Sequence, residues 1–237
     1  SAGTVWIPNN SSLRAQGKVD PRDDALRYMC RLAYPQRYYE DHPTLGLPQR
    51  AYDLVAAFYD HASPAVDHLT EAGVLDLVAD TRIPGPDTAM RVPTGHVLQG
   101  FPDYGSERFG NKLLNGRHLF PMPGGPDLLG QLEIGAAKHE VDVVLDHQAT
   151  DLLRNVDGEV VGLQLRCGHR PVLARARRAV VFASGGYAHN TDLVERHLPG
   201  RVFGTCATLG ARGAFVSIGV AAGAQLGNMH NARWNQV

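Results

Sequence analysis

VVFASGGYAHN, residues 180–190, joins a run of apolar residues directly to a pair of glycines. With Ala179 in front of it, the run Ala179–Ala183 predicts a buried strand of the kind found in parallel sheets. Gly185 and Gly186 have no Cβ, so a ligand can lie against the backbone at the carboxyl end of that strand, where open α/β sheets bind their ligands. By themselves the glycines fit a tight strand-to-helix turn equally well, with Asn190 capping a short helix after it.

The residues before this stretch predict an alternation of helix and strand. DLLGQLEIGAAKHE, residues 127–140, has helical spacing, and Val141–Leu145 follows it as a short buried strand. Two strands, Ala149–Arg154 and Glu159–Arg166, surround Asp157-Gly158, a dipeptide that tolerates the positive φ of a hairpin turn. A third strand is expected over Pro171–Ala176, which makes this part of the chain a hairpin or meander.

The first third of the chain is predicted to be helical. Asp20-Pro21 gives an N-cap and a first-turn proline for a helix over residues 21–34. A second helix is expected over residues 47–62, and Ser63-Pro64 starts a third that stops at Gly73. Tyr52, Phe58 and Tyr59 follow the helical spacing and are interpreted as packing residues.

Two further regions complete the chain. Residues 80–126 are rich in proline and glycine, which predicts irregular loops. Gly213–Leu226 carries small and aliphatic residues at helical spacing, which predicts a last helix. The expected organisation is therefore a helical segment over 21–79, loops over 80–126, an α/β return over 127–205 and a last helical region over 206–237.

Composition narrows the functional class. The 237 residues are 43% hydrophobic with a formal net charge of −1, which favours a globular protein with a small-molecule partner over one that binds nucleic acid. Cys30, Cys167 and Cys206 form no disulfide framework, and the eleven histidines are scattered, so we expect a reducing compartment, the cytoplasm, and no metal site. We expect neither a signal peptide nor an integral membrane segment, and the start at Ser1, without methionine, looks cut.

Five segments occur in the order found in one flavoprotein family: SAGTVWIPNN, FPDY, the hairpin, ARRAVVFASGGYAHN and GVAAGAQLGNMHNARW. Over nearly its whole length the chain resembles the FAD-dependent fumarate reductase and 3-ketosteroid Δ1-dehydrogenase flavoproteins. The resemblance implies an α/β fold, a partial Rossmann-like FAD-binding domain of the glutathione-reductase type. It also implies that the N-terminal βαβ unit and the cap domain are missing from this chain.

The resemblance also implies which residues serve FAD and catalysis. Ser1, Ala2, Gly3 and Thr4, together with Ala183, Ser184, Gly185 and Gly186, correspond to the segments that line the flavin and its diphosphate. Ala149 corresponds to a strand residue that offers its backbone to the adenine. Tyr104, in Phe101-Pro102-Asp103-Tyr104, corresponds to a tyrosine that assists proton removal from the substrate; the alternative is that it caps a proline-rich loop.

Two departures from the family bear on the cofactor. Thr-Gly-Asp-Gly or Thr-Gly-Asp-Ala usually precedes the last helix, whereas this chain has Arg212-Gly213-Ala214-Phe215 and lacks the carboxylate that would complement the helix dipole. Arg212 is interpreted as a solvated residue rather than an anion ligand, and so are Arg175, Arg177 and Arg178. No Gly-x-Gly-x-x-Gly occurs, and the remaining catalytic residues of the family would lie beyond Val237.

Three functions remain open from the sequence. The first is an FAD-dependent dehydrogenase that acts on the CH–CH group of a ketosteroid, with the electron acceptor undetermined. MHNARW favours it, since this segment is similar to the Met-x-x-Ala-Trp of steroid dehydrogenases. The second is a fumarate-reductase-like flavoprotein acting on a small dicarboxylate. The third is an inactive remnant or binding module, and we expect this chain alone to bind FAD weakly or not at all because it lacks the glycine-rich cradle for the diphosphate.

Overall fold

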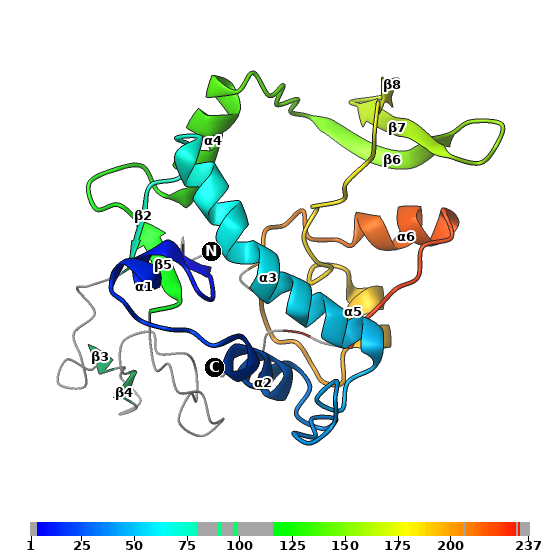
Figure 1. Ribbon diagram of the computed structural model, residues 1–237. Helices are drawn as coiled ribbons and strands as arrows, with labels where there is room; N and C mark the ends of the chain where they lie inside the picture. Colours follow the sequence, from blue (N-terminus) through cyan, green and yellow to red (C-terminus); the bar gives the residue numbers. More distant parts are fainter. Residues whose placement is uncertain are drawn as a thin grey trace. The chain divides into compact units, whose positions relative to one another are not determined.

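The computed structural model describes residues 4–79, 90–91, 97–98, 116–205, 207–230 and 232. The chain folds as two compact units, Ser1–Val143 and Val144–Val237. Both contain helices as well as strands (Figure 1). The fold is therefore mixed α and β, as the sequence predicts.

A small antiparallel sheet lies in the first unit. Its strands are β1 (Val5–Trp6), β5 (His118–Pro121) and β2 (Leu77–Ala79), with β5 in the middle. A separate pair, β3 (Met90–Arg91) and β4 (Val97–Leu98), is also antiparallel. Because β1 and β5 are more than a hundred residues apart, no local sequence signal indicates this sheet.

Four helices accompany that sheet: α1 (Ser11–Ala15), α2 (Arg22–Ala33), α3 (Gln49–Glu71) and α4 (Leu128–Lys138). α2 and α4 confirm the helices expected over residues 21–34 and 127–140. Asp127 caps α4 by accepting a hydrogen bond from the Gly130 amide at 2.8 Å. The expected cap of α2 is wrong, since Pro21 occupies the N-cap position and the Asp20 carboxylate points elsewhere.

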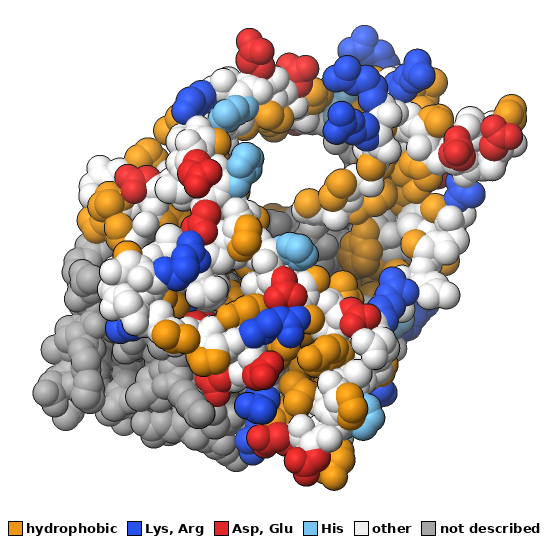
Figure 2. All heavy atoms as spheres, in the orientation of Figure 1, with side chains coloured by type: hydrophobic (Ala, Val, Ile, Leu, Met, Phe, Trp, Pro, Cys, Tyr) orange, Lys and Arg blue, Asp and Glu red, His pale blue; other side chains and the backbone are white. Residues whose placement is uncertain are grey.

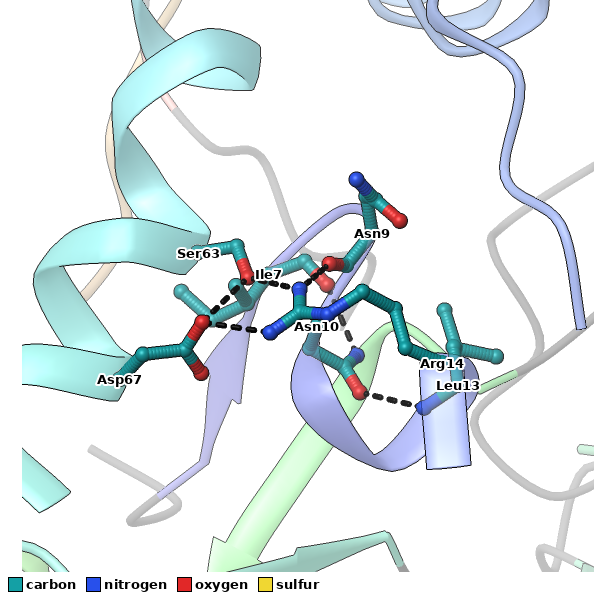
Figure 3. A network of polar contacts seen from close by, with 7 residues as sticks. All are labelled: Ile7, Asn9, Asn10, Leu13, Arg14, Ser63 and Asp67. Carbon is teal, nitrogen blue, oxygen red and sulfur yellow. Dashed lines mark hydrogen bonds and ion pairs between the residues drawn. The ribbon is translucent and has the colours of Figure 1, made fainter. Parts of the chain in front are cut away.

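α3 replaces the two helices expected on either side of Ser63-Pro64. It runs unbroken for 23 residues with Pro64 inside it. A proline in a helix interior removes one hydrogen bond. Arg14 bridges this point, donating to the Ser63 hydroxyl at 2.7 Å and to the Asp67 carboxylate at 2.5 Å (Figure 3). Tertiary contacts on both sides of the proline thus hold the helix together.

The hydrophobic core of this unit lies between α2 and α3. Leu26 and Cys30 of α2 pack with Ala56 of α3 and with two leucines of the connecting loop, Leu45 and Leu47. Tyr52 and Tyr59 pack against this cluster, as expected. Phe58 instead stacks on Trp6 at 6.1 Å between ring centroids.

A buried polar cluster joins the start of this unit to β5. Arg117 and Asp20 form an ion pair in which neither side chain is exposed, and Trp6 and Tyr28 place their rings within 5.5 Å of the guanidinium. Asn10 caps α1 and also donates to the Gly116 carbonyl at 2.8 Å. The cluster fixes where the chain enters and leaves the small sheet.

The second unit contains a three-stranded antiparallel sheet and two helices. β6 (His147–Arg154), β7 (Val160–Cys167) and β8 (Arg170–Arg175) form a meander, as predicted. Gly158 in the hairpin turn has φ of 84°. α5 (Thr191–His197) begins at Asn190, and α6 (Ala214–Ala221) is shorter than the helix expected over Gly213–Leu226. Lys and Arg side chains gather over the meander in Figure 2, and Arg175, Arg177 and Arg178 are exposed, in line with their interpretation as solvated.

Two predicted strands are absent from the described residues. Val141–Leu145 and Ala179–Ala183 belong to no strand, although both are apolar. Most of their side chains are exposed, with Leu145 75% and Val181 83% exposed, whereas Val180 and Phe182 are half-buried. A parallel strand forms only when a neighbour supplies its hydrogen bonds, and within the described chain no strand does so for either segment.

Candidate functional site

The predicted site residues fall into three groups. Ser1, Ala2, Gly3 and Tyr104 lie outside the described residues. Thr4 is half-buried and precedes β1 in the first unit. The others, Ala149 and Ala183–Gly186, all belong to the second unit. The geometry of a site can therefore be examined in the second unit alone.

The Ser184-Gly185-Gly186 turn presents bare backbone to solvent. All three residues are exposed, and Gly185 has φ of +75°, a conformation that glycine adopts without strain. A Cβ built at Gly185 or at Gly186 would meet no atom within 4 Å. The turn therefore fits the main-chain contact with a flat cofactor that the resemblance implies.

The tetrapeptide that follows, Tyr187–Asn190, holds the segment before α6 and the segment after it through three side chains. We call it the bracket. Each of its polar side chains bonds a backbone carbonyl: Tyr187 that of Met229, His189 that of Ala207 at 3.0 Å, and Asn190 that of Arg212 at 3.0 Å. The His189 amide adds a bond to the Ala211 carbonyl at 3.0 Å. Since a carbonyl accepts only, Nε2 of His189 must carry the hydrogen.

Burial raises the pKa of the Tyr187 phenol above its ordinary value. The phenol therefore stays protonated at neutral pH and serves as the donor to Met229. The sequence identified Asn190 as a helix cap, and it does accept a bond from the Leu193 amide at 3.1 Å. The bonds to Met229, Ala207 and Arg212 span 18 to 42 residues, and no local pattern predicts them.

Gly213 joins the glycine turn to the start of α6. Its amide donates to the Gly186 carbonyl at 3.1 Å, and its φ of +74° lies in the left-handed region. A Cβ at this position would lie 2.7 Å from Leu193 Cδ1 and 2.8 Å from Tyr187 Cβ. Conformation and close packing together require glycine here.

Gly213 also lines a cleft of about 480 Å³. Its walls come from β6, from α5 and from α6, and its lining residues are Gln148, Ala149, Thr150, Asn190, Asp192, Leu193, Arg196, Arg212, Gly213, Ala214, Val216, Ser217 and Ile218. The volume is within the range of small-molecule sites. Ala149 thus lies in a cleft whose edge, Gly213, is bonded to the glycine turn.

Backbone irregularity marks β6 inside this cleft. Ala149 pairs with Leu165, whereas Asp151 pairs with Gln164, so Thr150 is an extra residue that bulges out of the ladder. The main-chain groups of a bulged residue are released from strand pairing. The bulge therefore leaves Thr150, a residue that lines the cleft, outside the ladder.

Charged side chains of both signs line the cleft. Arg196 and Arg212 are exposed cations and Asp192 is an exposed acid. α6 has no acidic residue in its first turn, because Ala214 stands where the family has a carboxylate. Arg212 donates only a long bond to the Leu209 carbonyl at 3.4 Å, which agrees with its interpretation as a solvated residue.

Two other kinds of site are absent from the part of the chain that the structure describes. No three His, Cys, Asp or Glu side chains there are grouped closely enough to hold a metal ion. None of the helices described is both long and apolar enough to cross a membrane.

Comparison with known proteins adds sequence relatives. The 3-oxosteroid 1-dehydrogenase of Mycolicibacterium smegmatis is 26% identical over 250 residues, which cover 81% of this chain and 41% of the relative. The protein of the same name from Comamonas testosteroni is 24% identical over 84% of this chain and 41% of its own length. The chain therefore spans about two fifths of the length of these curated relatives.

Solved structures share the fold. A 3-ketosteroid Δ4-(5α)-dehydrogenase from Rhodococcus jostii RHA1, in complex with 4-androstene-3,17-dione, matches with a TM-score of 0.66 and 21% identity over 97% of this chain and 46% of its own. A 3-ketosteroid Δ1-dehydrogenase from Sterolibacterium denitrificans matches with a TM-score of 0.68 and 17% identity over 99% of this chain and 49% of its own. A flavocytochrome c3 fumarate reductase matches with a TM-score of 0.59 and 18% identity, over 94% of this chain and 33% of its own.

The sequence profile of one family matches almost the whole chain. The FAD binding domain is matched over residues 1–235, which include the glycine turn, the bracket and all the residues that line the cleft. The chain belongs to the FAD binding domain family.

Proposed function

We propose that this chain forms part of an FAD-dependent oxidoreductase that acts on the CH–CH group beside the ketone of a steroid. One observation carries the proposal: the bond from Gly213 to Gly186 joins the exposed glycine turn to the cleft that contains Ala149. The glycine turn thus bonds a residue that lines the same cleft as Ala149. The steroid dehydrogenase relatives supply the substrate class.

The residues of the chain have distinct roles in this proposal. The backbone of Ala149 and Thr150, which line the cleft, would hold the adenine, and the open turn Ser184–Gly186 would contact the flavin and its diphosphate. The resemblance assigns Ala183 and the opening residues Ser1–Thr4 to the flavin and its diphosphate as well. When bound, FAD accepts the hydride that leaves one carbon of the substrate.

The proton leaves the neighbouring carbon, which lies next to the ketone, and Tyr104 assists its removal. A phenol has an ordinary pKa of about 10, so it acts in this role only where its surroundings stabilise the phenolate. Loss of one hydride and one proton leaves a carbon–carbon double bond conjugated with the ketone. The substrate is a ketosteroid, and the reoxidising electron acceptor is not specified by these residues.

The finer description of the fold belongs to the same proposal. The chain would be the part of a Rossmann-like FAD domain that follows its N-terminal βαβ unit and precedes its cap domain. The exposed segments Val141–Leu145 and Ala179–Ala183 support this, because both have the composition of strands buried in a parallel sheet. In this proposal the chain keeps the four parts expected from its sequence, residues 21–79, 80–126, 127–205 and 206–237.

A fumarate-reductase-like activity is the second candidate, favoured by the structural match to the flavocytochrome. It would need cationic side chains that bind a dicarboxylate. The curated relatives from Mycolicibacterium smegmatis and Comamonas testosteroni are 3-oxosteroid 1-dehydrogenases, which favours the first candidate. An inactive remnant is the third candidate.

Ligand-observed NMR tests the cofactor site on the chain itself, because saturation transfer detects weak binding. We expect ADP to receive saturation from the protein and FMN, which lacks the adenylyl group, to receive much less. Val216→Trp, which fills the cleft, should abolish the ADP signal. Val160→Trp adds the same ring on β7, outside the cleft, and should leave the signal intact.

Two results would count against this site. The first is the absence of transfer to ADP; the second is equal transfer in both tryptophan variants. Flavin that stays bound through gel filtration would instead contradict our expectation that the chain alone holds FAD weakly.

A further inference from the structure

Asn190 uses the two ends of its amide for two different purposes. Oδ1 accepts a hydrogen bond from the Leu193 amide at 3.1 Å and caps α5. Nδ2 donates to the Arg212 carbonyl at 3.0 Å, 22 residues away. Capping requires only the oxygen, so the bond to Arg212 is a separate function of the same side chain.

The Arg212 carbonyl lies next to Gly213, the residue that connects the glycine turn with the cleft. The next residue, Gly213, bonds the glycine turn through its amide and touches both Leu193 and Tyr187. Gly213 also begins α6 and lines the cleft. A movement of the Arg212 peptide would therefore shift the glycine turn and the cleft wall together.

Other contacts hold this loop less directly. His189 bonds Ala207 and Ala211, both of which precede Arg212, and Tyr187 bonds Met229 beyond α6. Arg212 has its own amide bonded to the Gly210 carbonyl at 2.8 Å, a contact within the loop itself. Asn190 is thus the member of the bracket whose side chain reaches the residue beside Gly213.

From these contacts we infer that Asn190 is a positioning residue, whose Nδ2 donor sets the separation between the Ser184–Gly186 turn and the cleft wall at Gly213. This inference rests on the proposed function for its ligand, the ADP part of FAD. The Asn190 side chain thereby fixes the geometry of a site that would contact its ligand through main-chain groups.

Asn190→Asp separates the two roles within the 237-residue chain. Aspartate caps a helix as well as asparagine does, but its carboxylate has no hydrogen to donate to Arg212. We expect the Gly213 amide to exchange its hydrogen about two- to tenfold faster, the factor that corresponds to the loss of one hydrogen bond. Exchange of the Leu193 amide should stay unchanged in this variant and accelerate in Asn190→Ala.

Asn155→Asp is the matched control. Asn155 also accepts backbone bonds through Oδ1, from Asp157 and Glu159, and donates through Nδ2, to the Glu159 carboxylate at 2.8 Å. It lies in the hairpin turn, away from the bracket. The same chemical change there should leave Gly213 exchange and ADP saturation transfer as they are in the unmodified chain.

The outcomes separate this inference from the proposed function. Faster Gly213 exchange in Asn190→Asp, with reduced transfer to ADP, supports it. Unchanged exchange at Gly213, or faster exchange with full ADP transfer, overturns it. If the unmodified chain shows no transfer to ADP, the proposed cofactor site is contradicted and the exchange rates alone decide whether Asn190 positions Gly213.

Discussion

Arg117 binds the carboxylate of Asp20 at two points, Nε to Oδ2 at 2.8 Å and Nη2 to Oδ1 at 2.6 Å, with neither side chain exposed to solvent. Removing one partner of such a pair leaves a buried charge without compensation. We expect Arg117→Met to lower the free energy of unfolding by about 3–5 kcal/mol. Urea unfolding followed by circular dichroism measures this change.

The double variant Asp20→Leu/Arg117→Met is its control. Replacing both charges by apolar groups of similar size is often neutral or stabilising, so the double variant should be more stable than Arg117→Met alone. If the changes in the free energy of unfolding caused by Asp20→Leu and by Arg117→Met simply add in the double variant, the two side chains do not stabilise one another as an ion pair.

Pro64 gives the second prediction. Its ring removes one hydrogen bond from the interior of α3, and a proline in a helix interior costs about 3 kcal/mol relative to alanine. Pro64→Ala removes this cost, but it also removes the restriction that proline places on the unfolded chain, which stabilises the folded protein by about 1 kcal/mol. We expect a net stabilisation of about 1–2 kcal/mol, measured by urea unfolding. Ala65→Gly on the next residue should instead destabilise the protein by about 1 kcal/mol, and a destabilising Pro64→Ala would show that the ring is needed for packing.

Cys30 gives a prediction about reactivity. Burial raises the pKa of its thiol to about 11, and only the thiolate is alkylated. At pH 8, iodoacetamide should modify Cys30 more than about a hundredfold more slowly than a free thiol with a pKa of about 8.5. Peptide mapping by mass spectrometry, with a urea-unfolded sample for reference, follows each cysteine separately. Equal rates in the folded and unfolded samples would contradict the burial of this side chain.

The same shift has a consequence for stability. A folded-state pKa above the unfolded value means that the contribution of Cys30 is fully present below about pH 8.5 and declines as the pH rises toward 11. Replacing Cys30 by alanine removes this decline, so the stability difference between the variant and the unmodified chain should shrink in alkaline solution.

Tyr104 gives the prediction about catalysis. In an enzyme that contains this chain and the rest of the catalytic machinery, Tyr104→Phe should slow ketosteroid-dependent dye reduction by about 10²- to 10⁴-fold, the usual effect of losing an acid–base group. The flavin absorbance spectrum should not change. Full activity in the variant would favour the alternative that Tyr104 only caps its loop.

Local signals in the sequence were sufficient for several elements. α2, α4, the β6–β7 hairpin and the start of α5 are each determined by spacing, a cap or a turn within a few residues. The glycine turn was also found from sequence, since two glycines after an apolar run are a local feature. The residue that joins this turn to the cleft, Gly213, was noted as the start of the last helix and as part of a departure from the family, but not as a link to the turn.

The remaining elements depend on partners far along the chain. β1 and β5 pair across more than a hundred residues, and Asp20 serves Arg117 rather than the α2 N-terminus. The bracket bonds loops up to 42 residues away. Conversely, Val141–Leu145 has strand composition but no pairing partner in the described chain. Composition reports what a segment can bury, and pairing depends on what lies beside it.

Those exposed segments also govern how this chain behaves at high concentration. Val143, Val144 and Leu145 follow one another with 63–75% of each side chain exposed, and Val181 is exposed in a second apolar run. Exposed apolar segments without a strand partner are a template for pairing between molecules, and such short runs nucleate aggregation. Purification of the isolated chain should therefore favour dilute samples, and a charged substitution at Val144 offers a direct way to keep it monodisperse.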